Sequence, residues 1–268
     1  MSIRIRLPRR VANPLWAAAL SFLAVASAAA APDRRTKLVM LIAGKSYETG
    51  RTLPAFAAQF LERDFRTVVV TGAMTNERQS FDRIEELAAA DLLLVSVWRR
   101  SPPQEQMDAI RRYIESGRPV VGICTASHAF ARRPGVALPP GQADWPEWDA
   151  QVIGGNYTSH HPGGLITKVT AIDAAHPILA GVALPFYSKM ELNIVSPLRP
   201  GAHAILLGTL EGRTPEPAAW TFQHYGQGRT FFTPLGHPED FAQKPFQRLL
   251  LNGIHWAVGK PIGTAAER

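Results

Sequence analysis

Short apolar segments recur along the chain from residue 37 onward. Four of them are continuous rather than alternating, which is typical of strands buried on both faces of a parallel sheet. They lie at 37–43, 67–71, 91–97 and 119–123. We expect these four strands to be parallel neighbours, because strand–helix–strand units connect by right-handed crossovers.

Segments of helical spacing separate these strands. The pattern predicts helices at 52–63, 80–89, 103–116 and 125–131. Ser80 is placed to cap the second helix, and Gly117 to end the third. The alternation predicts an α/β fold with a doubly wound, mostly parallel sheet and helices on both faces. Ligands bind beyond the carboxyl ends of the strands in such sheets, so we look for a site there.

The regular alternation stops at about residues 132–165, a segment rich in proline and glycine. A loop of this length inside a domain is usually functional or partly folded. Beyond it the pattern predicts further strands and a closing helix. The strands lie at 165–172, 202–207, 217–222 and 228–234, and the last two form a hairpin. The helix lies at 244–258.

The first 31 residues have a different character. Four arginines precede an apolar run from Pro14 to Ala26, which Ser27 and four alanines follow. This is the pattern of a cleavable signal peptide, and the run is shorter than the ~20 residues that span a bilayer. An uncleaved anchor is the alternative. We expect a signal peptide over 1–31, then one domain over 32–264 with a loop insertion at about 132–165, in a periplasmic or secreted protein.

Removing this leader lowers the formal charge from +7 to +3, because it contains four arginines and no acidic residue. No run of lysine or arginine remains, so the composition gives no support for a nucleic-acid partner, or for a membrane partner after cleavage. The chain has a single cysteine, Cys124, which excludes a disulfide within the chain.

Cys124 follows directly after the fourth predicted strand, in the sequence VVGICTASHAF. A residue on a sharp strand-to-helix turn projects above the sheet beside backbone N–H groups, where a thiolate or an oxyanion is stabilised. His128 lies one helical turn further on and either lines the same site or packs in the core. The alternative for Cys124 is a buried residue that ends a core strand.

A second candidate segment is LGHPEDF, residues 235–241. His237 is a candidate base, and Glu239 is placed to orient its ring. The alternative is that Glu239 and Asp240 favour the start of the following helix.

In combination, these segments resemble known families. Cys124 followed much later by His237-Pro238-Glu239 is similar to the nucleophile and His-x-Glu of class I glutamine amidotransferases, whose fold is flavodoxin-like. The wider sequence resembles the ThuA-like (trehalose utilisation) family, which shares that fold. The resemblance covers about residues 37–260 and rests on VVGICTASHAF, WPEWDAQVIGGNY, AHPILAGV, YGQGRTFFTPLGHPEDF and FQRLLLNGIHWAVGK.

The resemblance implies a role in the use of glucosides or their oxidised derivatives. Members of the ThuA-like family generally carry histidine or arginine where this chain has Cys124, so a cysteine nucleophile is not implied by the family. Residue 126 is alanine rather than glycine, and glutaminase activity is not expected. We expect replacement of His237 to cost more function than replacement of Cys124.

Several loop residues suit a carbohydrate ligand, by stacking on a sugar ring or binding hydroxyls. The candidates are Trp98, Trp145, Trp148, Asn156, Tyr157, His160 and His161. The alternative for the tryptophans is that they attach the loop to the domain. Glu48 and Glu191 are further candidate pocket acids.

No cofactor is expected. A divalent metal held by His160, His161 and His237 is a weaker possibility, since adjacent histidines rarely bind one ion. Two functions remain open: an enzyme acting on a small sugar by hydrolysis or elimination, and a non-catalytic sugar-binding or accessory protein. The oligomeric state does not follow from the sequence.

Overall fold

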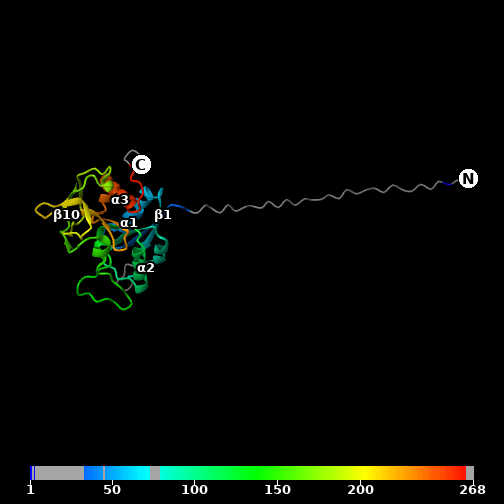
Figure 1. Ribbon diagram of the computed structural model, residues 1–268, viewed down its shortest axis with the longest axis horizontal. Coiled ribbons are helices and arrows are strands. Elements are labelled where there is room, and N and C mark those ends of the chain that lie inside the picture. The colour runs from blue at the N-terminus through cyan, green and yellow to red at the C-terminus, as the bar shows by residue number, and fades with distance from the viewer. Residues whose placement is uncertain (2, 4–32, 45, 73–78, 264–268) are drawn as a thin grey trace. The chain divides into compact units, whose positions relative to one another are not determined.

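A nine-stranded sheet forms the centre of the structure (Figure 1), a computed structural model that describes residues 1, 3, 33–44, 46–72 and 79–263. The strand order is β2-β1-β3-β4-β11-β10-β9-β6-β7. The strands are β1 (Thr36–Ala43), β2 (Phe65–Thr71), β3 (Leu92–Val97), β4 (Val120–Ile123), β6 (Thr167–Ala171), β7 (Phe186–Ser188), β9 (His203–Thr209), β10 (Glu216–Gln223) and β11 (Arg229–Thr233).

Strands β2, β1, β3, β4 and β11 are parallel neighbours. The prediction that the first four form one parallel set is confirmed. Strands β10, β9, β6 and β7 extend the sheet with antiparallel pairings, which begin at the predicted β10–β11 hairpin. Chain order along the parallel part changes direction between β1 and β3, the position at which such sheets form a crevice.

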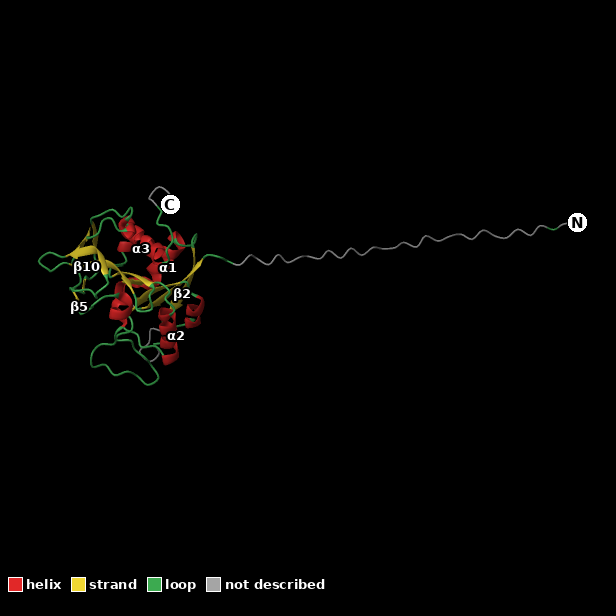
Figure 2. Ribbon diagram, viewed as in Figure 1, coloured by secondary structure: helices red, strands yellow, loops and turns green. Residues whose placement is uncertain are grey.

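Helices cover both faces of the sheet (Figure 2). Helices α1 (Thr49–Phe60) and α3 (Lys244–Ala257) lie on one face, and α2 (Gln104–Glu115) lies on the other. Alternate residues of β1 enter the two cores: Leu38 and Met40 on the first face, Val39 and Leu41 on the second. Burial of β1 on both faces explains its continuous apolar sequence.

The helix predicted over 80–89 is wrong in part. Ser80 caps no helix, and a 3₁₀ helix, η2, covers only Ile84–Ala89. Gln106 explains the difference, because its side chain binds both the N–H of Phe81 (2.7 Å) and its carbonyl (2.9 Å). These backbone groups are therefore not available for a helix.

The helix predicted over 125–131 is also replaced, by a short 3₁₀ helix, η3 (Cys124–His128). The carbonyl of Ala129 accepts from the N–H of Arg100 (2.7 Å), and that of Phe130 accepts from the N–H of Trp145 (2.9 Å). Tertiary hydrogen bonds thus end the helix after one turn.

The long segment at about 132–165 is partly folded. It contains a π-helix, η4 (Asp149–Ile153), and a short strand, β5 (Ser159–His160). Strand β5 pairs with β8 (Asn193–Ile194) in a separate two-stranded sheet. This small sheet brings the long segment against the loop before β8.

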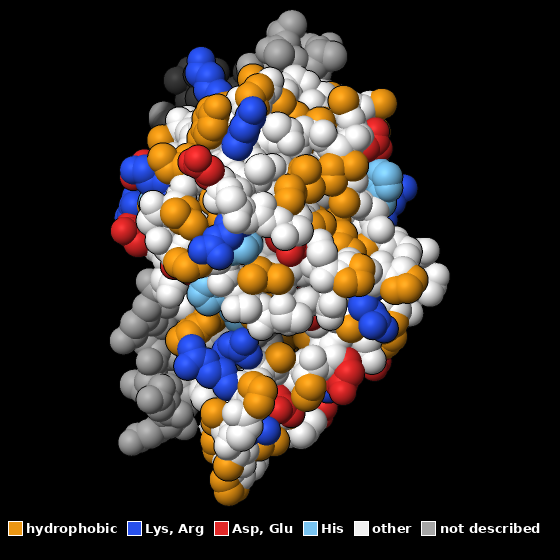
Figure 3. Space-filling view, turned by 90° about the vertical axis from the view of Figure 1, so that its left-hand side faces the viewer, with side chains coloured by type: hydrophobic (Ala, Val, Ile, Leu, Met, Phe, Trp, Pro, Cys, Tyr) orange, Lys and Arg blue, Asp and Glu red, His pale blue; other side chains and the backbone are white. Residues whose placement is uncertain are grey.

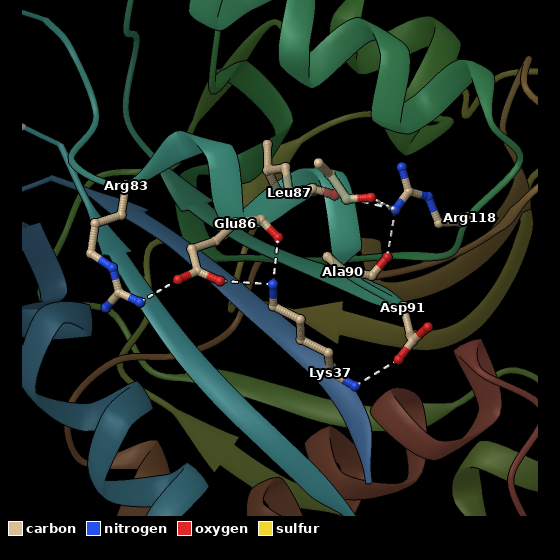
Figure 4. Close-up of polar contacts among 8 residues, drawn as sticks. Lys37, Arg83, Glu86, Leu87, Ala90, Asp91 and Arg118 are labelled. Atoms are coloured by element: carbon tan, nitrogen blue, oxygen red, sulfur yellow. Dashed lines mark hydrogen bonds and ion pairs between the residues drawn. The ribbon is translucent and has the colours of Figure 1, made fainter. Parts of the chain in front are cut away.

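The amino ends of β1, β3 and β4 are joined by a network of paired charges (Figure 4). The Lys37 ammonium lies 2.7 Å from a Glu86 carboxylate oxygen and donates to the Glu86 carbonyl at 2.9 Å. Asp91 accepts from the Lys37 N–H at 2.8 Å, and Arg83 also pairs with Glu86. Arg118 donates to the carbonyls of Leu87, Ala88 and Ala90. Lys37 and Arg83 lower the pKa of Glu86 to about 2.

The predicted signal peptide lies outside the described residues. Among the residues that are described, no helix is both long and apolar enough to cross a membrane.

Candidate functional site

A pocket of about 420 Å³ lies at the carboxyl ends of the parallel strands. The loops after β1, β3 and β4 supply Tyr47, Trp98, Arg99 and Cys124 to its wall. The residues around β5 and β8 form the opposite wall. The pocket therefore occupies the edge of the sheet where the sequence predicted a site.

Three of these lining residues have left-handed backbone conformations although none is glycine. The φ angles are 63° at Tyr47, 46° at Arg99 and 55° at Cys124. This conformation costs roughly 1–2 kcal/mol for a residue with a Cβ. Strain of this kind clusters at functional sites. Here it occurs after each of three neighbouring strands, and twice after β1, where Glu48 is also left-handed with a φ of 50°.

Cys124 is fully enclosed by its surroundings. Its thiol donates to the carbonyls of Leu235 and Gly236, each at 3.4 Å. A Cβ at Gly236 would lie only 2.4 Å from the Cys124 sulfur, so this close approach requires glycine. Burial, with a smaller contribution from Asp240, raises the pKa of Cys124 well above its ordinary value. The group is therefore a protonated thiol, which is the opposite of an activated nucleophile.

The arrangement expected for His237 and Glu239 is not formed. The Glu239 carboxylate is exposed and pairs with Lys189 at 2.8 Å. His237 instead accepts at Nδ1 from the backbone N–H of Glu239, at 3.3 Å. His237 is absent from the described pocket wall, and no described hydrogen bond joins it to Cys124. The catalytic roles of these residues remain predictions.

Asp240 is the carboxylate that organises this loop. It is buried and accepts from the N–H groups of Gly236 and His237, both at 3.0 Å, and from the Ser188 hydroxyl at 2.7 Å. From the sequence, Asp240 was expected only as an acid near a helix start, because nothing in a local pattern shows which acid will be buried.

A connected polar group crosses the pocket from one wall to the other. The Tyr47 hydroxyl donates to Glu191 Oε2 at 2.7 Å, and His160 Nε2 lies 3.5 Å from the same oxygen. The Tyr157 hydroxyl lies 2.9 Å from His160 Nδ1. Burial, reinforced by Glu191, raises the pKa of Tyr47, which stays protonated. The structure thus brings together a carboxylate, an imidazole and two phenols.

His128 also lines the pocket, and its ring lies 4.3 Å from the Tyr157 ring, centre to centre. Burial, followed by the nearby charges of Arg99, His160 and Arg133, lowers the pKa of His128 to about 3. It is therefore neutral near pH 7.

The other sequence candidates separate into two groups. Trp98, Tyr157 and His160 line the pocket, whereas Asn156 and the buried His161 do not. A ligand-stacking role for Trp145 and Trp148 is wrong, because both are fully buried. Trp148 donates to the Ala126 carbonyl at 2.7 Å, so these tryptophans attach the long segment to the domain. Glu191 lines the pocket, while Glu48 pairs with Arg51 outside it.

Asp149 is a further buried carboxylate beside the pocket, and no sequence pattern predicted it. It is buried against Gly155, and its Oδ2 accepts from the N–H of Tyr157 at 2.6 Å. Burial raises the pKa of Asp149 to about 7. The residue holds the backbone that presents Tyr157 to the pocket.

Basic side chains gather close to histidines on the face shown in Figure 3. Arg99 and Arg133 both line the pocket, and the Arg133 guanidinium lies 5.6 Å from the centre of the Trp98 ring.

Within the described residues, no cluster of three or more His, Cys, Asp or Glu side chains has a geometry that could hold a metal ion.

A sequence model of the ThuA family, described as trehalose utilisation, matches residues 40–257. This chain belongs to the ThuA family. The match spans β1 to α3, and so includes the whole pocket wall and the Asp240 loop. No curated protein matches the sequence of this ThuA-family chain.

Solved structures share the fold of this ThuA-family protein. A ThuA-like protein from Bacteroides uniformis has a TM-score of 0.62 at 16% identity, covering 86% of this chain and 94% of its own. One from Parabacteroides merdae has a TM-score of 0.60 at 18% identity, covering 87% and 93%. A β-galactosidase from Rahnella sp. R3 has a TM-score of 0.56 at 11% identity, covering 85% of this chain but 32% of its own. At these identities the likeness concerns the fold alone.

Proposed function

We propose that this ThuA-family protein is an enzyme that acts on a small glucoside or oxidised glucoside in the pocket at the carboxyl edge. The observation that carries the proposal is the contact between Glu191, Tyr47 and His160, with Tyr157 adjoining His160. The exposed Trp98 ring at the rim offers a surface on which a sugar ring can stack. A volume of about 420 Å³ is that of a small-molecule site.

The composition of the wall favours elimination over ordinary glycoside hydrolysis. Most glycosidases use two carboxylates on either side of the scissile bond. Among the described lining residues, Glu191 is the only carboxylate. Elimination needs one base and one acid. His160, supported by Glu191, supplies the base, and a phenol supplies the acid. A hydrolase would have to obtain its second acid from elsewhere.

The alternative function is a non-catalytic sugar-binding protein on the same fold. The thiol of Cys124 is protonated and His237 does not line the pocket, so the catalytic group expected from the sequence is not assembled. This keeps the alternative open.

We also propose that the fold is of the doubly wound, glutamine amidotransferase-like class. The strand order β2-β1-β3-β4-β11 supports it, because it repeats the flavodoxin-like order.

The test is a screen of glycosides and keto-glycosides by thermal shift, with and without divalent metals, followed by product analysis. For a compound that is turned over, Glu191→Gln should lower kcat by about 10²–10⁴ while binding persists. Glu211→Gln, an exposed glutamate in the turn after β9, is the matched control and should behave as wild type. Binding without turnover by the wild type would favour the non-catalytic alternative, and an absence of binding would refute both.

The proposal also places the protein in the periplasm or outside the cell. It rests on the basic and apolar segments before Ser27. N-terminal sequencing of exported protein should begin near Ala31 or Pro32. Recovery of Met1 in that fraction would contradict export with cleavage.

A further inference from the structure

Among the residues that the structure describes, two guanidinium groups of the pocket have no carboxylate partner. Arg99 is half-buried and donates to the Ala131 carbonyl at 2.9 Å, and Arg133 lies over the Trp98 ring. In the described part of the chain, neither forms an ion pair with an Asp or Glu side chain. By contrast, the neighbouring Arg132 is held by Asp144 at 2.8 Å. Arg99 and Arg133 are therefore the cations that an anionic ligand would meet.

The two arginines act on the same small space. Both line the pocket beside Tyr157, and the Arg99 guanidinium lies 6.0 Å from the centre of the Tyr157 ring. They also act on each other as like charges. Repulsion between neighbouring like charges is relieved when an anion binds between them. Glu191 does not serve this purpose, because it is already engaged by Tyr47 and His160.

We propose that the ligand of this pocket is a uronate, a sugar that carries a carboxylate, and that Arg99 and Arg133 bind that carboxylate. The inference rests on the proposed carbohydrate function and narrows its substrate class. A carboxylate suits this pair because guanidinium groups form charge-assisted hydrogen bonds with its two oxygens. Trp98 and Tyr157 would then flank the sugar ring.

This substrate class suits the polar group across the pocket. Charge neutralisation by the arginines makes the C5–H bond next to the carboxylate easier to ionise. His160, supported by Glu191, takes the C5 proton as the C4–C5 double bond forms and the C4–O4 bond breaks. The Tyr157 hydroxyl gives its proton to the departing O4, and His160 returns a proton to Tyr157 through their 2.9 Å contact. The products are an unsaturated uronate and an alcohol, with no oxidant, reductant or water consumed.

The first arm of the test measures binding to the full chain by calorimetry, with D-glucuronate, D-glucose and D-glucose 6-phosphate. We expect glucuronate to bind about tenfold more tightly than glucose, as one charged hydrogen-bonded contact would give. Arg133→Gln should remove most of this preference. Arg133 is exposed, so this variant should fold; Arg133→Lys should restore part of the preference. The matched control is Arg213→Gln, an exposed arginine in the turn after β9.

The second arm follows elimination by the ultraviolet absorbance of the unsaturated product, with digalacturonate and the neutral galactobiose of the same linkage. Absorbance that grows only with digalacturonate supports the proposal. Equal affinity for glucose and glucuronate, unchanged in Arg133→Gln, would overturn the uronate inference and leave the sugar site standing. Tighter binding of glucose 6-phosphate than of glucuronate would also overturn it. If none of the sugars bound the wild type, the proposed function itself would fail.

Discussion

The two edges of the parallel sheet differ in how completely their polar groups are paired. At the amino edge, Lys37 is linked to Glu86 and Asp91, and Arg118 donates to backbone carbonyls (Figure 4). At the carboxyl edge, three pocket-lining residues adopt left-handed backbone conformations, as Arg83 also does at the amino edge. Two arginines of the carboxyl edge have no carboxylate partner in the described part of the chain. The comparison indicates that the first edge stabilises the fold, while the second retains charge that a ligand can pair with.

The largest expected effect is at the amino edge. Lys37→Met removes the ammonium that contacts both the carboxylate and the carbonyl of Glu86, and its side chain is only 7% exposed. We expect the free energy of unfolding, measured by urea denaturation, to fall by more than for any substitution below, because the buried ammonium loses both contacts. Sugar affinity should not change. A loss of affinity at constant stability would show that the two edges are not separated in this way.

His128 gives the next effect, at the carboxyl edge. Its pKa is lowered to about 3 in the folded protein, from 6.5. Between these values the unfolded chain binds a proton that the folded protein does not, so stability falls as pH falls from 6.5 toward 3. Between pH 6.5 and 5, protonation of His128 in the unfolded chain should lower the free energy of unfolding of the wild type by about 2 kcal/mol. His128→Gln should not show this part of the decrease. Parallel stability curves for the two proteins over this range would refute the buried, neutral histidine.

Backbone strain predicts a smaller effect. Arg99→Ala and Arg99→Gly both remove the guanidinium, but only glycine accepts a φ of 46° without cost. The glycine variant should be more stable than the alanine variant by about 1 kcal/mol in urea denaturation. Since glycine normally destabilises by adding flexibility to the unfolded chain, the reverse order would show that the strain is absent.

The smallest effect is expected at Cys124. Its thiol is protonated and donates to two backbone carbonyls, a role that a serine hydroxyl can take over. Cys124→Ser should retain kcat/KM within about tenfold of wild type on the substrate that the screen identifies. Near-complete loss of turnover, together with labelling of Cys124 by a substrate-derived electrophile, would assign a nucleophile instead.

The parallel half of the fold could be predicted because its strands are buried on both faces and read as continuous apolar runs. The short helices could not, because Gln106, Arg100 and Trp145 take the backbone groups that a longer helix would need. Gln106 lies 25 residues from Phe81 along the chain. Arg100 and Trp145 lie about 15 residues or more from the carbonyls that they bind after η3. Local periodicity does not report contacts over such separations.

The candidate site was predicted in position but only partly in composition. Cys124, Trp98, Tyr157, His128 and His160 line the pocket as expected from the strand ends and the long segment. The partnership of Glu191 with Tyr47, 144 residues apart, follows from the way the β5–β8 sheet covers the pocket. No spacing rule connects residues so distant, and the same is true of Asp240 and Ser188.

The position of a bound sugar in a crystal of this protein tests the central claim most directly. Crystals should be soaked with the sugar that gives the largest thermal shift. The account predicts that the sugar lies at the carboxyl edge, in contact with Trp98, Tyr157 and Glu191. A sugar bound instead in the larger hollow of about 610 Å³ beside Phe60 and His255, with the carboxyl edge filled only by water, would contradict it.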